Sequence, residues 1–311
     1  MNPQEHFGSK GLISILIPTR NRPKNVKRVV SSAFATASKP SKIEFLFYVD
    51  EDDKSFPSGF TNEKIKLISG PRIWISLALN VLYTRSRGEI IMYCGDDVVF
   101  RTKEWDDTIR NEFDKVPDKI CLVHTNDGVL QSKDIARHGF LHRKWFKTLG
   151  SPFPALRGMP NDLWCSETAT VLKRMRYIDD VIIEHVHYRQ GGKSKLDSTY
   201  KDAYNLSRSL KIKKMYKKLS NDRRYERILL AEVMSIRPKL EKTFLLGELL
   251  ATNDRILRSL STGLSKNEII ATQRRLRSLK NYQTLSIILK YIPRLLFRKS
   301  LIWQKYINSK T

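Results

Sequence analysis

The first 200 residues alternate between apolar runs of strand length and stretches in which apolar residues recur at helical spacing. Leu12–Ile17, Ile43–Val49 and the segment "EIIMYCG" at 89–95 have the composition of buried strands. Between them, "NRPKNVKRVVSSAFATA" and "ISLALNVLYTRSRG" have helical spacing, with Asn21 as a cap of the first helix and Gly88 as the end of the second. This order predicts a mostly parallel sheet with helices on its faces.

Polar side chains follow each of these predicted strands. Thr19 and Arg20 come after the first strand, the acidic cluster 50–53 after the second, and Asp96 and Asp97 after the third. Open parallel sheets bind ligands beyond the carboxyl ends of their strands, so these three groups are expected to share one crevice. Two adjacent carboxylates there suit a hard divalent cation, although an Asp-Asp pair is also a common loop or cap feature.

Two histidines end a later predicted strand. In "YIDDVIIEHVH", Val181 and Ile183 form the apolar side, and His185 and His187 stand two residues apart. Positions i and i+2 of a strand point the same way, a geometry that can hold a metal ion. The alternative is one hydrogen-bonded histidine and one exposed histidine.

Two further stretches have a structural interpretation from their own residues. "HGFLHRKWFKTLGSPFP" at 138–154 mixes aromatic and basic residues and is first of all a candidate core helix. Asp162, in "MPNDLWCSE", is placed to cap a helix that begins at Leu163.

Charge is concentrated in the last third of the chain. Residues 201–311 contain 26 Lys and Arg against 8 Asp and Glu, a net +18 of the total +25. The pattern there is helical, without a sequence repeat, and predicts a basic helical domain whose field would attract a polyanion such as nucleic acid. The last predicted helix, "IILKYIPRLLFRKSLIWQKYI", also has the composition of a helix that lies on an anionic membrane surface.

The remaining composition describes a globular protein of the cytoplasm. Hydrophobic residues make up 41% of the chain, enough for a large core. The first residues are polar, and the run Leu12–Ile17 is too short for a signal peptide or a membrane span. Three widely spaced cysteines indicate neither a disulfide framework nor a zinc site, so reduced thiols and a cytoplasmic location are expected.

In order, "ISILIPTRNRP", "FYVDEDD" and "LALNVLYTRSRGEIIMYCGDDVVF" resemble the nucleotide-sugar-binding half of the inverting family 2 glycosyltransferases, over about Ile13 to Tyr200. The resemblance implies a Rossmann-like GT-A domain at 1–200, with a mostly parallel sheet and helices on both faces. The basic helical domain at 201–311 follows it. The resemblance further implies that a sugar moves with inversion from a nucleotide sugar, a UDP-sugar by expectation, to a hydroxyl acceptor with the help of Mn²⁺ or Mg²⁺.

The resemblance also implies roles for individual residues. Asp97 is the first metal ligand, followed by His185 and, as second choice, His187, while Gly95 takes the position of the family's first aspartate and implies a weaker dependence on metal. Asp162 takes the position of the catalytic base. The nucleotide sugar is expected to contact Pro18, Thr19, Arg20, Arg22, Asp50, Asp52, Asn80, Arg87, Asp96, Arg143 and Trp145.

The acceptor is predicted from the basic domain and from the form of the motifs. The motifs look like those of phage-encoded members of the family, some of which glycosylate hydroxymethylated pyrimidines in DNA, so double-stranded DNA with such bases is the expected acceptor and the host cytoplasm the expected location. One alternative is an envelope polysaccharide or lipopolysaccharide transferase docked on the membrane surface. The other is a catalytically inactive nucleic-acid-binding protein. No obligate protein partner is indicated.

Overall fold

The computed structural model describes residues 8–129, 133–149, 153, 161–188, 196–209, 216 and 219–234. Its strands are β1 (Ser9–Thr19), β2 (Ile43–Asp50), β3 (Ile65–Gly70), β4 (Gly88–Tyr93), β5 (Val98–Phe100), β6 (Leu122–Asn126), β7 (Gly139–His142) and β8 (Met175–His185). Its helices are α1 (Pro23–Thr36), α2 (Trp74–Arg85), α3 (Trp105–Asp114), α4 (Arg143–Leu149), α5 (Asn161–Val171), α6 (Ser198–Ser209) and α8 (Ser220–Val233), with a short 3₁₀ turn at Pro40–Lys42.

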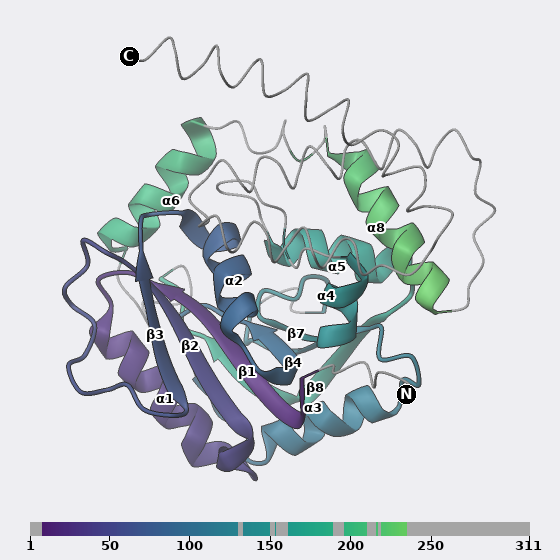
Figure 1. Cartoon of the computed structure of the whole chain (residues 1–311), viewed down its shortest axis with the longest axis horizontal. Helices are drawn as coiled ribbons and strands as arrows, with labels where there is room; N and C mark the ends of the chain where they lie inside the picture. The colour runs from purple at the N-terminus through teal and green to yellow at the C-terminus, as the bar shows by residue number, and fades with distance from the viewer. Residues whose placement is uncertain are drawn as a thin grey trace, which may run out of the picture. The chain divides into compact units, whose positions relative to one another are not determined.

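The strands form one mixed sheet in the order β3-β2-β1-β4-β7-β6-β8-β5. Strands β1 to β4 are parallel to one another, as the strand-helix alternation predicts. The prediction of a mostly parallel sheet holds, because β6 and β8 pair in parallel and run in the same direction as β1 to β4. The exceptions are β7, which runs antiparallel to both β4 and β6, and β5, which runs antiparallel to β8. The fold is therefore a mixed α/β sheet, and one strand at its centre has the opposite direction (Figure 1).

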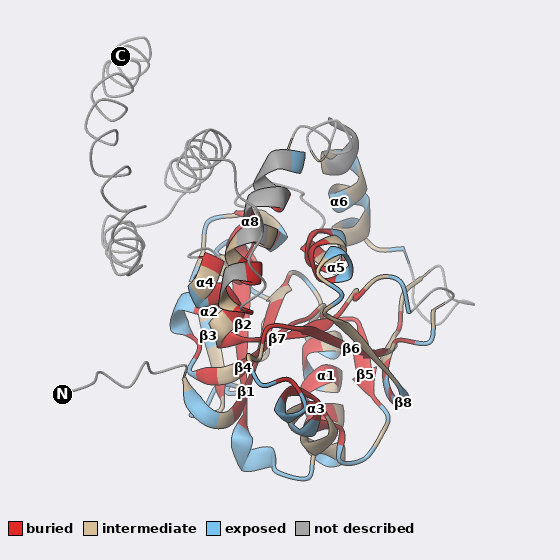
Figure 2. Cartoon of the chain, turned by 90° about the vertical axis from the view of Figure 1, so that its right-hand side faces the viewer, coloured by how far each residue is buried: buried red, intermediate tan, exposed pale blue. Residues whose placement is uncertain are grey.

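Alternate residues of the central strands point to opposite faces of the sheet, and helices cover both faces. Ile13, Ile15 and Ile17 of β1 belong to the main apolar cluster with residues of α1 and α3, which pack on one face of the sheet. Helices α2 and α4 cover the other face (Figure 2). Burial of both faces explains why β1, β2 and β4 are almost continuously apolar rather than alternating.

Three local predictions from the sequence are wrong. The segment at 138–154 is not one helix: Gly139–His142 is strand β7, and α4 begins at Arg143. Asn21 does not cap α1, since it has a φ of 55° and its backbone N–H donates to Asp53. Gly88 does not end α2 but begins β4, where a Cβ would lie 2.5 Å from the Ser14 hydroxyl.

Two other parts of the structure differ from what the sequence predicts. Strand β3 was not predicted, because "IKLISG" is half exposed and follows a polar loop. Helix α6 (Ser198–Ser209) crosses the predicted domain boundary at 200, and α8 lies after it. Helix α8 packs against α4 and α5, where the Trp164 indole N–H donates to Glu226. Most of the predicted basic domain, from 235 onward, lies outside the described residues.

Two expectations drawn from composition concern the described residues. Cys94, Cys121 and Cys165 are buried, and none of them forms a disulfide within the described part of the chain. In the part of the chain that the structure describes, no helix combines the length and the apolar character that crossing a membrane requires.

A buried glutamate joins the parallel half of the sheet. Glu44 of β2 is 1% exposed and accepts hydrogen bonds from the Ser14 hydroxyl at 2.7 Å and the Arg87 backbone N–H at 2.6 Å. Its second oxygen accepts from Lys66 of β3 at 3.1 Å and from the Arg87 side chain. Burial raises the pKa of Glu44, but these donors outweigh it and the pKa lies below its usual value.

Replacing Glu44 by Gln should lower the free energy of unfolding at pH 7 by about 2–3 kcal/mol, because charge-assisted hydrogen bonds are lost in a buried site. The depressed pKa means that this stabilisation is fully present above the pKa of the unfolded chain and is lost as the pH falls through the folded-state pKa. Urea unfolding of both proteins at pH 7 and at progressively lower pH measures the difference. A gap of unchanged size in the acid range would contradict the assignment.

Candidate functional site

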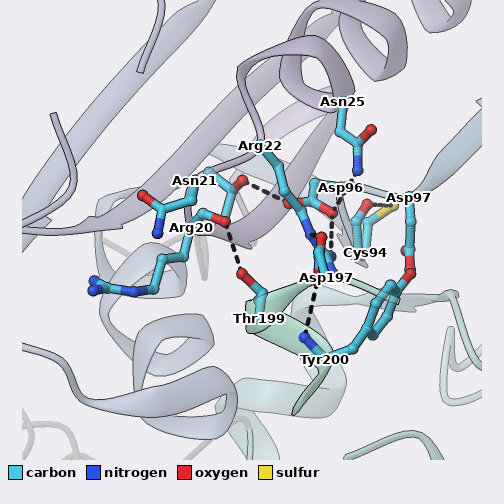
Figure 3. A network of polar contacts seen from close by, with 12 residues as sticks. Arg20, Asn21, Arg22, Asn25, Cys94, Asp96, Asp97, Asp197, Thr199 and Tyr200 are labelled. Atoms are coloured by element: carbon cyan, nitrogen blue, oxygen red, sulfur yellow. Dashed lines mark hydrogen bonds and ion pairs between the residues drawn. The ribbon is translucent and has the colours of Figure 1, made fainter. Parts of the chain in front are cut away.

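The polar groups that follow β1, β2 and β4 meet at one edge of the sheet. Thr19 ends β1, Asp50 ends β2, and Asp96 and Asp97 follow β4, and all four side chains are buried or nearly so. Figure 3 shows the centre of this cluster together with residues from the start of α6. The polar groups predicted from the strand ends thus lie together at one edge of the sheet.

Asp96 points toward the loop that follows β1. Its carboxylate accepts hydrogen bonds from the Thr19 hydroxyl at 2.6 Å, from Arg22 at 2.9 Å and from Asn25 at 3.3 Å. The side chain is 3% exposed, so Arg22 supplies the charge that its burial requires. Burial raises the pKa of Asp96 despite Arg22, and repulsion by Asp97 adds to this rise.

Asp97 points the other way, toward the end of β8. Its Oδ2 lies 3.2 Å from Nε2 of His185 and accepts a hydrogen bond from the Tyr200 hydroxyl at 2.5 Å. Burial raises the pKa of Asp97, but His185 and Tyr200 outweigh it and hold the pKa well below its usual range. The two adjacent carboxylates therefore have separate partners, and Asp97 is the one that stays ionised over the widest range of pH.

His138 completes a cluster of possible metal donors. One ligand atom each from Asp97, His138 and His185 lies within 4.8 Å of the others. His138 immediately precedes β7. Because β7 runs antiparallel to β4, the first residue of β7, Gly139, pairs with the last residue of β4, Tyr93. Burial lowers the pKa of His138 to about 3, aided by the neighbouring His185, so its imidazole is neutral and can act as a ligand.

The donor set suits a divalent metal ion on chemical grounds. Among the described residues, Nδ1 of His185 is buried without a hydrogen-bond partner, as expected of a ring whose surroundings are completed by a bound group. His187 is not part of this three-residue cluster. It lies past the end of β8, and its ring packs against Tyr188 and Tyr200.

Beside this cluster, Arg20 joins the acidic residues that follow β2. It bonds to Asp50 at 2.9 Å and makes a two-pronged ion pair with Asp52. The hydrogen bond from Arg20 lowers the pKa of the exposed Asp52 to about 2, whereas burial raises the pKa of Asp50. Pro18, which pairs with Tyr48 in the sheet, places this arginine at the edge.

Sequence interpretation missed the contribution of α6. Arg22 makes a two-pronged ion pair with Asp197, at 2.7 and 2.8 Å, and its guanidinium lies 4.1 Å from the centre of the Tyr200 ring. The Thr199 hydroxyl donates to the backbone carbonyl of Arg20. Asp197, Thr199 and Tyr200 lie more than 170 positions along the chain from Arg20 and Arg22. No local sequence pattern therefore indicates these contacts.

A second arginine makes a similar bridge. Arg72 pairs with Asp202 of α6 at 2.7 Å and lies 3.5 Å from Asp50. Its guanidinium also stacks 4.4 Å from the ring centre of Trp74, a residue with a φ of 67° at the start of α2. Two arginines thus tie α6 to the ends of β1 and β2.

Asp162 lies in the first turn of α5 and is half-buried. One carboxylate oxygen accepts a hydrogen bond from the Leu163 backbone N–H at 2.8 Å. Asp162 is not the cap of a helix that begins at Leu163, because α5 begins at Asn161 and includes Asp162. Burial raises the pKa of Asp162, although Arg137 and His185 are close enough for their charges to oppose the rise.

Four residues expected to contact a nucleotide sugar support the fold instead. Arg87 immediately precedes β4, and Arg143, the first residue of α4, bonds to the start of the same strand. The six residues of β4 place this end of the strand roughly 20 Å from Asp96. The Arg143 guanidinium donates to the backbone carbonyls of Gly88 and Ser86. Trp145 is buried in the core, and the Asn80 amide makes two hydrogen bonds to the Phe153 backbone.

Comparisons with known proteins place the chain near several solved structures. No protein-family model and no curated protein matches it. It is similar to a mannosyltransferase from Pyrobaculum calidifontis in complex with GDP-Man and Mn²⁺ (16% identity, TM-score 0.46, covering 90% of this chain and 84% of that one). It is also similar to S. aureus TarS 1-349 (14%, 0.45, 80% and 81%) and to the catalytic domain of Drosophila beta1,4galactosyltransferase 7 (13%, 0.40, 61% and 77%). At these low values, the likeness assigns no activity, and the function has to be argued from the site.

Replacing Arg22 by Gln should lower the free energy of unfolding by about 3 kcal/mol, because the buried Asp96 carboxylate loses its cation. Adding Asp96→Asn to the Arg22→Gln protein should recover much of this loss, since a neutral amide needs no counter-charge. A double-mutant cycle of guanidinium unfolding measures the coupling between the two residues. Simply additive losses would show that Arg22 does not stabilise the charge of Asp96.

Proposed function

We propose that the chain is a metal-assisted, inverting glycosyltransferase that transfers a sugar from a nucleotide sugar to a hydroxyl group. One observation carries this proposal: the donor cluster of Asp97, His138 and His185 lies at the carboxyl edge of the sheet, within electrostatic reach of the carboxyl group of Asp162. A cation site beside a carboxylate of raised pKa supplies the two functions that such a transfer needs, stabilisation of a leaving anion and removal of a proton.

The donor is proposed to lie along the ends of β1 and β2. Asp50 and Asp52, already joined to Arg20, offer acceptors for the hydroxyl groups of a ribose and the N–H groups of a base. Arg20 and Arg22 add positive charge on the side where a diphosphate would lie. A UDP-sugar is the proposed donor.

The reaction follows from these placements. The acceptor oxygen forms a bond to C1 of the sugar, the bond between C1 and the diphosphate oxygen breaks, and the nucleoside diphosphate departs with the electron pair. The carboxylate of Asp162 takes the proton of the acceptor hydroxyl. A bound divalent ion, held by Asp97 with His185 and His138, would neutralise charge on the diphosphate.

The proposed acceptor is a 5-hydroxymethylpyrimidine in double-stranded DNA. Support comes from the net charge of +18 on residues 201–311, dispersed over several predicted helices rather than beside one apolar face. The competing acceptor is a glycan or lipid at an anionic membrane surface, which the same charge would also attract.

A transfer assay tests the function and its acceptor together. The full chain is given radiolabelled nucleotide sugars and Mn²⁺, with three acceptors in parallel: duplex DNA containing 5-hydroxymethylpyrimidines, unmodified duplex DNA and a lipid extract. Label on the hydroxymethylated DNA alone supports the whole proposal. Label in the lipid fraction keeps the transferase and overturns the DNA acceptor, and neither transfer nor hydrolysis of any nucleotide sugar overturns both.

Replacing Asp162 by Asn should lower the turnover number by roughly a hundredfold or more, because the amide keeps the contact with Leu163 but cannot accept the proton. Binding of the nucleotide sugar should stay within about twofold, as measured by calorimetry. Asp114→Asn, an exposed substitution at the end of α3, is the matched control and should leave both quantities unchanged. Normal turnover in Asp162→Asn would remove this residue from the chemistry.

A further inference from the structure

The donor cluster contains two imidazoles and only one carboxylate, each from a different part of the fold. Asp97 follows β4, His138 precedes β7 and His185 ends β8. Their ligand atoms lie within 4.8 Å of one another, and the three side chains are buried or half-buried. Convergence of three such groups from separate elements is a stronger indication of a binding site than a run of neighbouring acidic residues in one loop.

Gly95 explains how these side chains fit together. A Cβ on this residue would lie 2.4 Å from Oδ1 of Asp97 and 3.3 Å from Cε1 of His138. The first distance is far below van der Waals contact, so any larger residue would displace the Asp97 carboxylate. The space at position 95 is therefore used by the carboxylate and by the imidazole of His138, and Gly95 itself brings no ligand.

In the absence of an ion, His138 has a weak partner for its lone pair. Its Nδ1 accepts a hydrogen bond from the Gly95 backbone N–H at 3.3 Å, near the long limit for such a bond. A neutral imidazole has one lone pair, and a metal ion that takes it replaces only this long hydrogen bond. The Nε2 atom, buried and unpartnered among the described residues, then carries the proton.

The composition of the donor set determines which ions it prefers. Mg²⁺ is a hard ion that prefers oxygen ligands and keeps its water molecules, whereas imidazole nitrogens favour first-row transition metals. A site with one carboxylate also carries less negative charge than a site built from two or three acidic residues, which weakens its attraction for Mg²⁺ further.

We propose that His138 is a metal ligand, and that the site of Asp97, His138 and His185 selects a transition-metal dication such as Mn²⁺ over Mg²⁺. The proposal deepens the proposed function, on which it rests for the role of the ion. It concerns binding of the metal alone, so it can fail or hold independently of sugar transfer.

Isothermal titration of the full chain with MnCl₂ or MgCl₂, without a nucleotide sugar, tests the selection. Wild-type protein should bind Mn²⁺ at least about tenfold more tightly than Mg²⁺. His138→Gln should weaken Mn²⁺ binding by about tenfold or more. Loss of a residue that only hydrogen-bonds to a metal ligand already weakens metal binding by about tenfold, so loss of a ligand should cost at least as much. Equal affinities of wild-type protein for the two ions would overturn the selectivity.

The matched control is His124→Gln. His124 is also a buried histidine with an unpartnered Nε2 among the described residues, but it lies on β6 outside the donor cluster. Its substitution should leave Mn²⁺ affinity unchanged. Equal losses of affinity in His124→Gln and His138→Gln would mean that both act through the fold, and unchanged affinity in His138→Gln would overturn its assignment as a ligand.

Two further measurements keep the test decisive if His138→Gln is poorly folded. Electron paramagnetic resonance of bound Cu²⁺ should show coupling to two imidazole nitrogens in the wild-type protein, and coupling to a single nitrogen would overturn the proposal. Gly95→Ala, which keeps all three ligands, should weaken Mn²⁺ binding by displacing the Asp97 carboxylate. If the metal binds as described but no nucleotide sugar is turned over, the proposed function fails while this inference stands.

Discussion

The site depends on the separation of two neighbouring negative charges. Asp96 and Asp97 are adjacent and almost fully buried, and each has its own set of partners on a different side. Arg22 forms ion pairs with both Asp96 and Asp197, so the charge of one carboxylate helps to hold the start of α6 beside the ends of β1 and β4 (Figure 3). The other carboxylate is thereby left for His185 and Tyr200. Without Arg22, burial of the pair would require protonation of Asp96 or exposure to water.

Tyr200 links this arrangement to the donor cluster. Its hydroxyl donates to Oδ2 of Asp97, the same oxygen that lies beside His185. Tyr200 belongs to α6, the helix that Arg22 and Arg72 also tie to the sheet. The residue that would hold a metal ion is therefore also one of the contacts of α6.

Sequence reasoning found the residues whose position depends only on the ends of parallel strands. Thr19, Asp50 and Asp96 could be predicted because an apolar run that stops at a polar residue marks a strand end, and parallel strands bring those ends together. The direction of β7 could not be predicted, because the sequence of a four-residue strand does not indicate its direction. The residues that follow it in the sequence have helical spacing, which hid the strand itself. The wrong placement of Arg143 and the omission of His138 both follow from that one unknown. Asp197 and Tyr200 were missed because ion pairs across so long a stretch of chain leave no periodic trace.

The antiparallel strand has a consequence for how this protein can change through evolution. His138 and Arg143 lie immediately before and after the four residues of β7. The length of this strand therefore sets the position of a possible metal ligand at one edge of the sheet and of the arginine that bonds α4 to β4 at the other. A one-residue insertion in β7 would reverse the facing of its side chains and shift both flanking residues at once. Selection on either residue therefore constrains the other, and length variation should be excluded from this strand even where the surrounding loops tolerate it.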